Sequence, residues 1–169
     1  MNSKRCVWLS AMCVCAALAM GCRTTSEYNP FASVSSYDTI VIEDFEGPGR
    51  SGYEFAERVA QAFATEGIGS RIVRAQETGR ALRVEGVVTR YSRGNAAMRL
   101  RYGHNIGNAR FAAKAVVTDN ETGELVARVY LNESYDAVRD RNQRIHQDVD
   151  ALAERAAQDF AKKLADSSP

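Results

Sequence analysis

The sequence predicts an α+β fold, in which two main helices pack against a mixed or antiparallel sheet in the order strand, helix, several strands, helix. Three observations predict it. A β-branched run lies near residue 40, two later runs alternate apolar and polar residues, and two long segments repeat apolar residues at helical spacing. The chain has 169 residues, a length that suits one folded domain.

The first strand and the first helix are expected on either side of a glycine-rich break. Residues 37–45 form the strand, whose β-branched centre is typical of a strand covered on both faces. A helix follows the break at 46–50, because Ser51 and Glu54 have the spacing of a capping box and Gly67 ends the pattern. The apolar stripe of this helix consists of Phe55, Val59, Ala62 and Phe63.

Four further strands and a last helix are predicted after residue 70. A short strand covers 71–74, and residues 81–91 alternate strongly. Residues 109–119 and 125–135 form a hairpin across a tight turn at 119–123. The last helix is expected at 142–165, and its apolar face consists of Ile145, Val149, Leu152, Ala156, Phe160 and Leu164.

The first 21 residues resemble the signal peptide of a bacterial lipoprotein. Two basic residues precede an uncharged apolar run at 7–20, which is shorter than the roughly 20 residues that span a bilayer. The run Leu-Ala-Met-Gly-Cys at 18–22 resembles a lipobox, in which cleavage leaves Cys22 as the acylated first residue. The alternatives are an ordinary signal peptide that is cut elsewhere and an N-terminal membrane helix.

This resemblance implies a division of the chain and a location. Residues 1–21 are the signal peptide, 22–36 an acylated cysteine with a polar tether, 37–165 a single α+β envelope domain, and 166–169 a tail. Fully extended, the tether would reach roughly 50 Å. Because Arg23 and not Asp follows the cysteine, the chain resembles lipoproteins of the outer membrane that face the periplasm. The expected acyl groups include palmitate.

The cysteines and the charge exclude several classes of protein. Cys6, Cys13 and Cys15 lie in the leader, so a processed chain keeps only Cys22 and has no disulfide or cysteine metal site. Without residues 1–21 the basic residues fall from 22 to 20, because Lys4 and Arg5 leave, against 21 acidic residues. A near-neutral chain without a basic field is not expected to bind nucleic acid.

The most unusual stretch lies between two strands, at 90–110. It holds three glycines and five arginines. A glycine-rich loop can offer main-chain N–H groups to an anion, and arginines can complete the site. The stretch matches neither a P-loop nor a dinucleotide fingerprint. The alternative is an ordinary solvated connection. The candidate binding residues of this loop are Arg93, Arg99, Arg101, Gly103, His104 and Gly107.

Catalytic and metal-binding patterns are weak in this sequence. The only histidines, His104 and His146, lack metal-ligand spacing, and no G-x-S-x-G occurs. Glu43 and Asp44 are neighbours in a strand, so they point to opposite faces and would not easily share a substrate. We therefore expect no catalytic residue, no metal and no cofactor. The charged run at 136–150 is interpreted as a solvated helix entry.

A set of turn and strand residues resembles a known family. The set consists of Glu43-Asp44-Phe45, Glu85-Gly86, Gly94-Asn95, Arg99, Gly103, Gly107, Asp119 and Thr122-Gly123. It resembles the bacterial lipoprotein family known as domain of unknown function 4410, over about 37–165. These residues specify backbone shape more than chemistry, and the family implies no catalytic residues. The element order is also similar to envelope lipoproteins of the curli-secretion type and to lipoprotein activators of penicillin-binding proteins.

The resulting hypothesis is a non-enzymatic, membrane-anchored lipoprotein with a periplasm-facing binding or assembly domain. Its working surface would be the 91–110 loop with the adjoining hairpin. The expected partners are the membrane, through the anchor, and an envelope protein or the cell wall, and a homo-oligomer is possible. Two alternatives stay open. One is a lipid-tethered enzyme acting on envelope polymers through His104 or the carboxylates at 43–44. The other is a subunit of a ring-shaped export complex.

Overall fold

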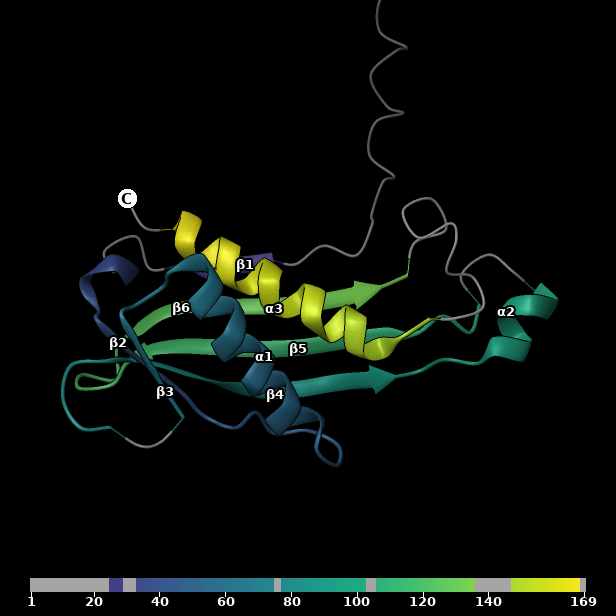
Figure 1. Cartoon of the computed structure of the whole chain (residues 1–169), viewed down its shortest axis with the longest axis horizontal. Helices are drawn as coiled ribbons and strands as arrows, with labels where there is room; N and C mark the ends of the chain where they lie inside the picture. Colours follow the sequence, from purple (N-terminus) through teal and green to yellow (C-terminus); the bar gives the residue numbers. More distant parts are fainter. Residues whose placement is uncertain (1–24, 29–32, 75–76, 103–105, 136–146, 168–169) are drawn as a thin grey trace, which may run out of the picture.

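A single six-stranded sheet with helices on one face organises the chain (Figure 1). The computed structural model describes residues 25–28, 33–74, 77–102, 106–135 and 147–167. The strands are β1 Thr25–Tyr28, β2 Thr39–Ile42, β3 Arg71–Val73, β4 Leu82–Ser92, β5 Arg110–Asp119 and β6 Leu125–Ser134. The helices are a 3-10 turn η1 Val34–Ser36, and α1 Ser51–Glu66, α2 Ala96–Tyr102 and α3 Val149–Asp166. The predicted α+β class is confirmed.

The sheet is mixed, and its strand order is β1-β6-β5-β4-β2-β3. β2 pairs in parallel with both β3 and β4, and α1 returns the chain between β2 and β3. β4, β5 and β6 form a long antiparallel meander. β4 and β6 end, and β5 begins, at the same end of the meander. The connections that leave the sheet at this end therefore lie close together.

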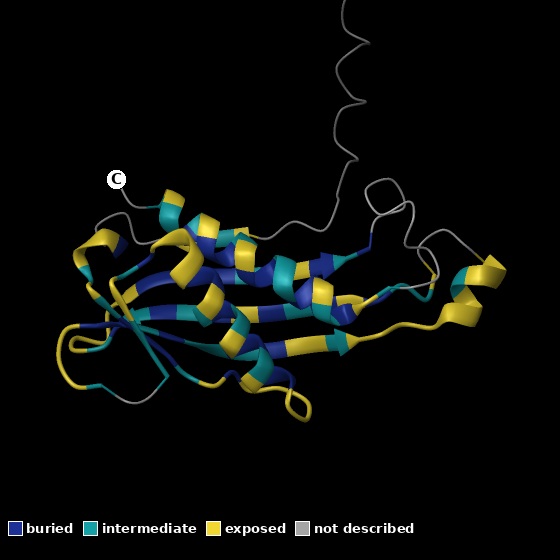
Figure 2. Cartoon of the chain, viewed as in Figure 1, coloured by how far each residue is buried: buried dark blue, intermediate teal, exposed yellow. Residues whose placement is uncertain are grey.

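The core lies between the sheet and the helix pair α1 and α3, as the buried faces in Figure 2 show. The alternation predicted for β4 and β5 is confirmed, because the alternate apolar side chains of both strands are buried against the helices. Phe55 of α1 contacts Phe111 of β5 at a ring-centroid distance of 4.8 Å. Phe63 of α1 meets Phe160 of α3 edge to face at 5.1 Å. These rings join both helices to each other and to the sheet.

The first helix begins and ends at the predicted residues, but its start has different contacts. Ser51 is already helical, and its hydroxyl donates to the main-chain oxygen of Pro48 at 2.8 Å instead of accepting from the helix. The predicted capping box with Glu54 is therefore wrong, since Arg50 occupies the cap position without a side-chain bond. Gly67 ends the helix with φ +70°, as the sequence predicts.

The last helix begins later than predicted, at Val149. Asp148 is its N-cap, and its carboxylate accepts from the N–H of Asp150 at 2.9 Å. The hydroxyl of Tyr135 also accepts from the N–H of Asp148 at 2.8 Å. The predicted first turns, with Ile145, lie outside the described residues. Of the described helices, none is long and apolar enough to cross a bilayer.

The polar segment before the domain also differs from the expected tether. Thr25–Tyr28 forms β1 and pairs antiparallel with β6, with Thr25 opposite Tyr130. Val34–Ser36 forms a 3-10 turn in which Val34 is buried in the core. Part of the interval 22–36 therefore belongs to the folded domain. Polar residues form this edge strand because main-chain pairing needs no apolar pattern.

Candidate functional site: the arm between β4 and β5

The connection between β4 and β5 is a projecting arm, and its described residues, 93–102 and 106–109, are defined here as the α2 arm. Figure 1 shows α2 standing beyond the end of the sheet, away from α1 and α3. The sequence predicts a loop here, but residues 96–102 form a helix. Their composition, Ala-Ala-Met-Arg-Leu-Arg-Tyr, contains good helix formers. The side-chain oxygen of Asn95 accepts from the N–H of Met98 at 3.1 Å and caps the first turn.

Two glycines close the base of the α2 arm. The N–H of Asn95 donates to the main-chain oxygen of Gly107 at 2.8 Å. Gly94 and Gly107 have φ values of +68° and +75°, which side chains with a Cβ disfavour. A Cβ on Gly94 would also lie 2.2 Å from the oxygen of Gly107. The special backbone predicted for Gly107 is confirmed, whereas Gly103 and His104 lie outside the described residues.

The predicted arginines of the arm have different roles. The half-buried Arg99 donates from Nη1 to the oxygen of Gly107 at 2.7 Å, and to that of Arg93 at 3.5 Å. Arg99 therefore holds the arm together. The side chains of Arg93 and Arg101 are exposed. The guanidinium of Arg101 lies 5.4 Å from the ring centre of Tyr102, so these two side chains share one patch of surface.

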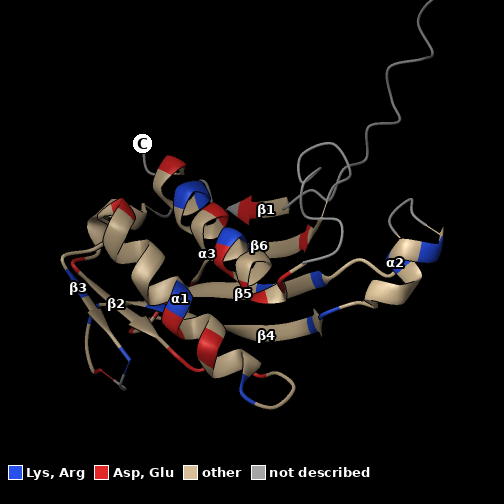
Figure 3. Ribbon diagram, turned by 45° about the vertical axis from the view of Figure 1, so that its right-hand side comes forward, with Lys and Arg blue, Asp and Glu red and all other residues tan. Residues whose placement is uncertain are grey.

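The exposed surface of the arm combines apolar and cationic side chains. Six large apolar side chains are exposed in the described part of the chain, and four of them lie on the arm. These four are Met98 at 40%, Leu100 at 67%, Tyr102 at 48% and Ile106 at 45%. No Asp or Glu occurs between Glu85 and Asp119, and Figure 3 shows α2 with basic and uncharged residues alone. Exposed apolar side chains gathered on one element make the arm a candidate interaction surface. The sequence did not reveal these apolar side chains as a surface, because a predicted loop has no helical face on which they could be grouped.

Side-chain amides attach the arm to the rest of the domain. Asn108 donates to the main-chain oxygen of Tyr135 at 3.0 Å, just after β6. Gln147 donates to the side-chain oxygen of Asn108 at 3.1 Å and accepts from the N–H of Ala109 at 2.7 Å. The returning end of the arm is thus joined to the end of β6 and to the entry of α3, which fixes its direction.

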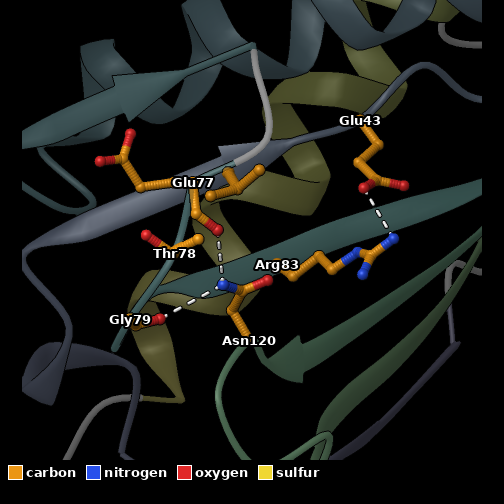
Figure 4. A pocket seen from close by; sticks show the side chains of 7 residues that line it. Glu43, Glu77, Thr78, Gly79, Arg83 and Asn120 are labelled. Atoms are coloured by element: carbon orange, nitrogen blue, oxygen red, sulfur yellow. Dashed lines mark hydrogen bonds and ion pairs between the residues drawn. The ribbon is translucent and has the colours of Figure 1, made fainter.

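A second candidate is an open polar cavity of about 380 Å³ near the other end of β4 (Figure 4). Its lining residues are Val41, Glu43, Glu77, Thr78, Gly79, Arg83 and Asn120. Arg83 and Glu43 form an ion pair at 2.7 Å, and this hydrogen bond raises the pKa of Arg83 above its usual value. The amide of Asn120 donates to the main-chain oxygens of Glu77 at 3.0 Å and Gly79 at 3.2 Å. The bonds of Arg83 and Asn120 thus connect β2, the 77–79 segment and the β5–β6 turn, which gives these two side chains a structural role.

The carboxylates considered as an acid/base pair are held apart by different partners. Glu43 pairs with Arg83, and Asp44 pairs with Arg74, whose Nε also lies 3.1 Å from Glu57. Each carboxylate therefore has its own arginine. The expectation that the two would not share a substrate agrees with this geometry.

Comparison with known proteins places the chain in a family. Residues 51–138 match the family described as "Domain of unknown function (DUF4410)", and the chain belongs to it. The predicted resemblance to this family is confirmed. No curated protein matches the chain.

Two solved structures share the fold, and a third has a lower similarity. Two structures of the PelC dodecamer from Paraburkholderia phytofirmans are 12% and 13% identical to this chain, with TM-scores of 0.63 and 0.61. The alignments cover 84% and 87% of this chain and 98% of each PelC chain. A minor lipoprotein from Acinetobacter baumannii is 13% identical over 78% of this chain and 91% of its own, with a TM-score of 0.38.

Proposed function

We propose that this protein is a lipid-anchored subunit of a homo-oligomer in the cell envelope, with a periplasm-facing domain that binds or assembles and does not catalyse. One observation supports the proposed homo-oligomer. The fold that this chain shares with PelC extends over 98% of the PelC chain, and that protein forms dodecamers. Homo-oligomers with closed symmetry are also the commonest assemblies of such domains.

The anchor is supported by the sequence of the first 22 residues. The lipobox-like run ends at Cys22, and the folded domain begins at Thr25. Several acyl chains on one cysteine give a stable attachment, whereas one chain binds only marginally. Arg23 after the cysteine supports an outer-membrane location, and an envelope protein or the cell wall is the proposed further partner.

The rival function, a tethered enzyme acting on envelope polymers, has less support. Its carboxylates at 43–44 are each occupied by an arginine in the structure. Its other candidate, His104, lies outside the described residues. The assembly function needs no such group.

The oligomer is tested on the full chain, purified from membranes in a mild detergent. Light scattering gives the protein mass of the particle, and chemical crosslinking gives the number of chains. We expect a discrete multiple of the chain that persists on dilution and gives a ladder ending at one size. A monomer at every concentration, with no ladder, contradicts the proposal.

A further inference from the structure

We propose that the α2 arm is a second membrane contact, which places its exposed apolar side chains in the interface of the bilayer that holds the anchor. The inference rests on the proposed acylation of Cys22. It names the partner of the arm as a phospholipid surface that carries negative charge.

The first argument is the short distance between the anchor and the sheet. Cys22 is three residue steps from Thr25, the first residue of β1, and three steps span at most about 10 Å. A folded β1 therefore keeps the domain close to the bilayer. A tether of the full interval 22–36 would have allowed roughly 50 Å.

The second argument is the direction in which the chain leaves the sheet. β1 is antiparallel to β6, and Thr25 lies opposite Tyr130. Thr25 is therefore at the end of β1 that lies toward the last residues of β6. At that end of the sheet Ser134 pairs with Arg110, and the arm begins. Figure 3 shows the β1 arrow pointing away from α2. From Tyr130 to Ser134 the strand extends about 13 Å. The chain before Thr25 therefore joins β1 on the side toward the arm, at a point about 13 Å short of the end of β6.

The third argument is the chemistry of the arm. Leu100 is 67% exposed, and Met98, Tyr102 and Ile106 are 40–48% exposed. Such side chains, set among arginines, are the composition of segments that lie in the boundary between headgroups and acyl chains, at a depth of about 5–10 Å. Aromatic rings such as Tyr102 favour this boundary. The guanidinium groups of Arg93 and Arg101 can remain at the level of the phosphates.

The fourth argument is the uneven charge along the molecule. The arm itself carries basic residues and no acidic residue, although Asp148 and Asp150 lie at the nearby start of α3. The turn at the opposite end, which joins β5 to β6, carries Asp119, Glu121 and Glu124. An anionic surface therefore attracts the arm and repels this turn, which gives the same orientation as the anchor.

The conformation of the arm is also fixed by hydrogen bonds within this chain. The bonds from Asn95 and Arg99 to Gly107 fix its base, and Asn108 and Gln147 attach it to the domain. A preformed surface loses little conformational entropy on binding. A second copy of the chain could also occupy such a patch, but the direction of the anchor favours the lipid surface.

The test uses a tryptophan placed on the arm of the processed, acylated chain. Trp8 is the only tryptophan of the sequence and lies in the expected signal peptide, so the processed chain gives a silent background and Tyr102→Trp places a probe at an exposed site. The chain is reconstituted in vesicles of phosphatidylcholine and phosphatidylglycerol, with or without bromine on the acyl chains. We expect the brominated lipid to remove most of the probe's fluorescence. Leu125→Trp, at an exposed site at the start of β6, is the control and should lose little.

Further variants connect the quenching to the surface of the arm. Leu100→Ser, and Arg93→Ala with Arg101→Ala, change exposed side chains and should leave the thermal midpoint unchanged. Each should reduce the quenching at position 102. An unchanged circular-dichroism melt of every variant shows that the domain remains folded.

Three results would overturn the inference. The probe at position 102 could keep its fluorescence in brominated vesicles, or both positions could be quenched equally. In the third result, the fluorescence of the probe changes with the number of protein chains per vesicle and not with bromination. The arm would then contact a second copy of the chain. Fatty-acid labelling of Cys22 in the same preparation separates these results from a failure of the anchor.

Discussion

The guanidinium of Arg99 donates a hydrogen bond to the main-chain oxygen of Gly107 at 2.7 Å, and this bond joins the helix of the α2 arm to its returning chain. The same oxygen accepts the N–H of Asn95 at 2.8 Å. Arg99 is therefore a residue that shapes the arm, whereas Arg101 lies on its exposed surface. Changing both arginines together would mix these two roles, so they are best changed one at a time.

Arg99→Ala should loosen the arm and leave the domain folded. A hydrogen bond from a charged group contributes roughly 1.5 kcal/mol or more, so the amide of Asn95 should exchange its hydrogen about tenfold faster. The free energy of unfolding of the domain should fall by no more than roughly the same 1.5 kcal/mol, because the unfolded chain also lacks this bond. Hydrogen exchange followed by NMR measures the first quantity, and urea unfolding measures the second.

Arg101→Ala is the matched control for this prediction. Its guanidinium contacts the ring of Tyr102 and is exposed, so the amide of Asn95 should exchange as in the unchanged chain. Equal exchange in the two variants would mean that Arg99 does not hold the arm.

Gly94→Ala should disrupt the base of the arm more than a comparable change elsewhere. The residue has φ +68°, a conformation that costs a residue with a Cβ about 1–2 kcal/mol, and its Cβ would meet the oxygen of Gly107 at 2.2 Å. Gly123→Ala is the control, since φ is +72° there but no atom lies within 4 Å of the added Cβ. Urea unfolding and exchange at Asn95 should separate the two variants. The same loss in both would exclude the close contact as the cause.

Phe63→Ala should destabilise the domain by about 3–5 kcal/mol, and Leu152→Ala by about 2–5 kcal/mol. Both side chains are fully buried, and the ring of Phe63 packs edge to face on Phe160. Leu100→Ala, at a site that is 67% exposed, should change the free energy of unfolding by less than about 0.5 kcal/mol. Chemical unfolding checks the three values. Small losses for both buried residues would show that the helix faces are assigned incorrectly.

Asp119 should contribute stability that is lost in acid. Hydrogen bonds from the N–H of Thr122, the hydroxyl of Tyr37 and the N–H of Glu121 lower the pKa of Asp119 from 3.8 to about 2. A depressed pKa stabilises the folded state above the ordinary value, and this contribution disappears as the pH falls from 3.8 to about 2. The urea midpoint of Asp119→Asn should therefore decrease less than that of the unchanged chain across this window. Parallel curves for the two chains would contradict the assignment.

Tyr37, whose hydroxyl donates to Asp119, should contribute stability that is lost in alkali. Burial, followed by the hydrogen bond to Asp119, raises the pKa of Tyr37 from 10.0 to about 12. A raised pKa stabilises the folded state below 10.0, and this contribution is lost as the pH rises to about 12. Tyr37→Phe should lack that part of the alkaline decrease. Unfolding curves at matched pH values test it.

Periodicity predicted most of the fold. The apolar stripes gave α1 and the face of α3 that contains Leu152 and Phe160, and alternation gave the inward residues of β4 and β5. These patterns arise because one face of each element is buried. They do not determine helix starts, which depend on single capping bonds such as that of Asp148.

The arm and the edge strand could not be predicted in the same way. β1 pairs through its main chain, which leaves no apolar pattern in Thr25–Tyr28. α2 has no buried side chain, so its seven residues show no stripe. The glycines and arginines of the arm marked the site in the sequence, but only the contacts of Arg99 distinguish a structural arginine from a surface one.

Acylation of Cys22 is the central claim, because the proposed location, the short distance to β1 and the orientation of the arm all depend on it. The most direct measurement is metabolic labelling of the full chain with a clickable palmitate analogue, beside the Cys22→Ala chain. We predict that the unchanged chain is labelled and shortened by 21 residues, and that the Cys22→Ala chain is unlabelled and keeps its full length. A Cys22→Ala chain that is labelled and processed like the unchanged chain would contradict the account.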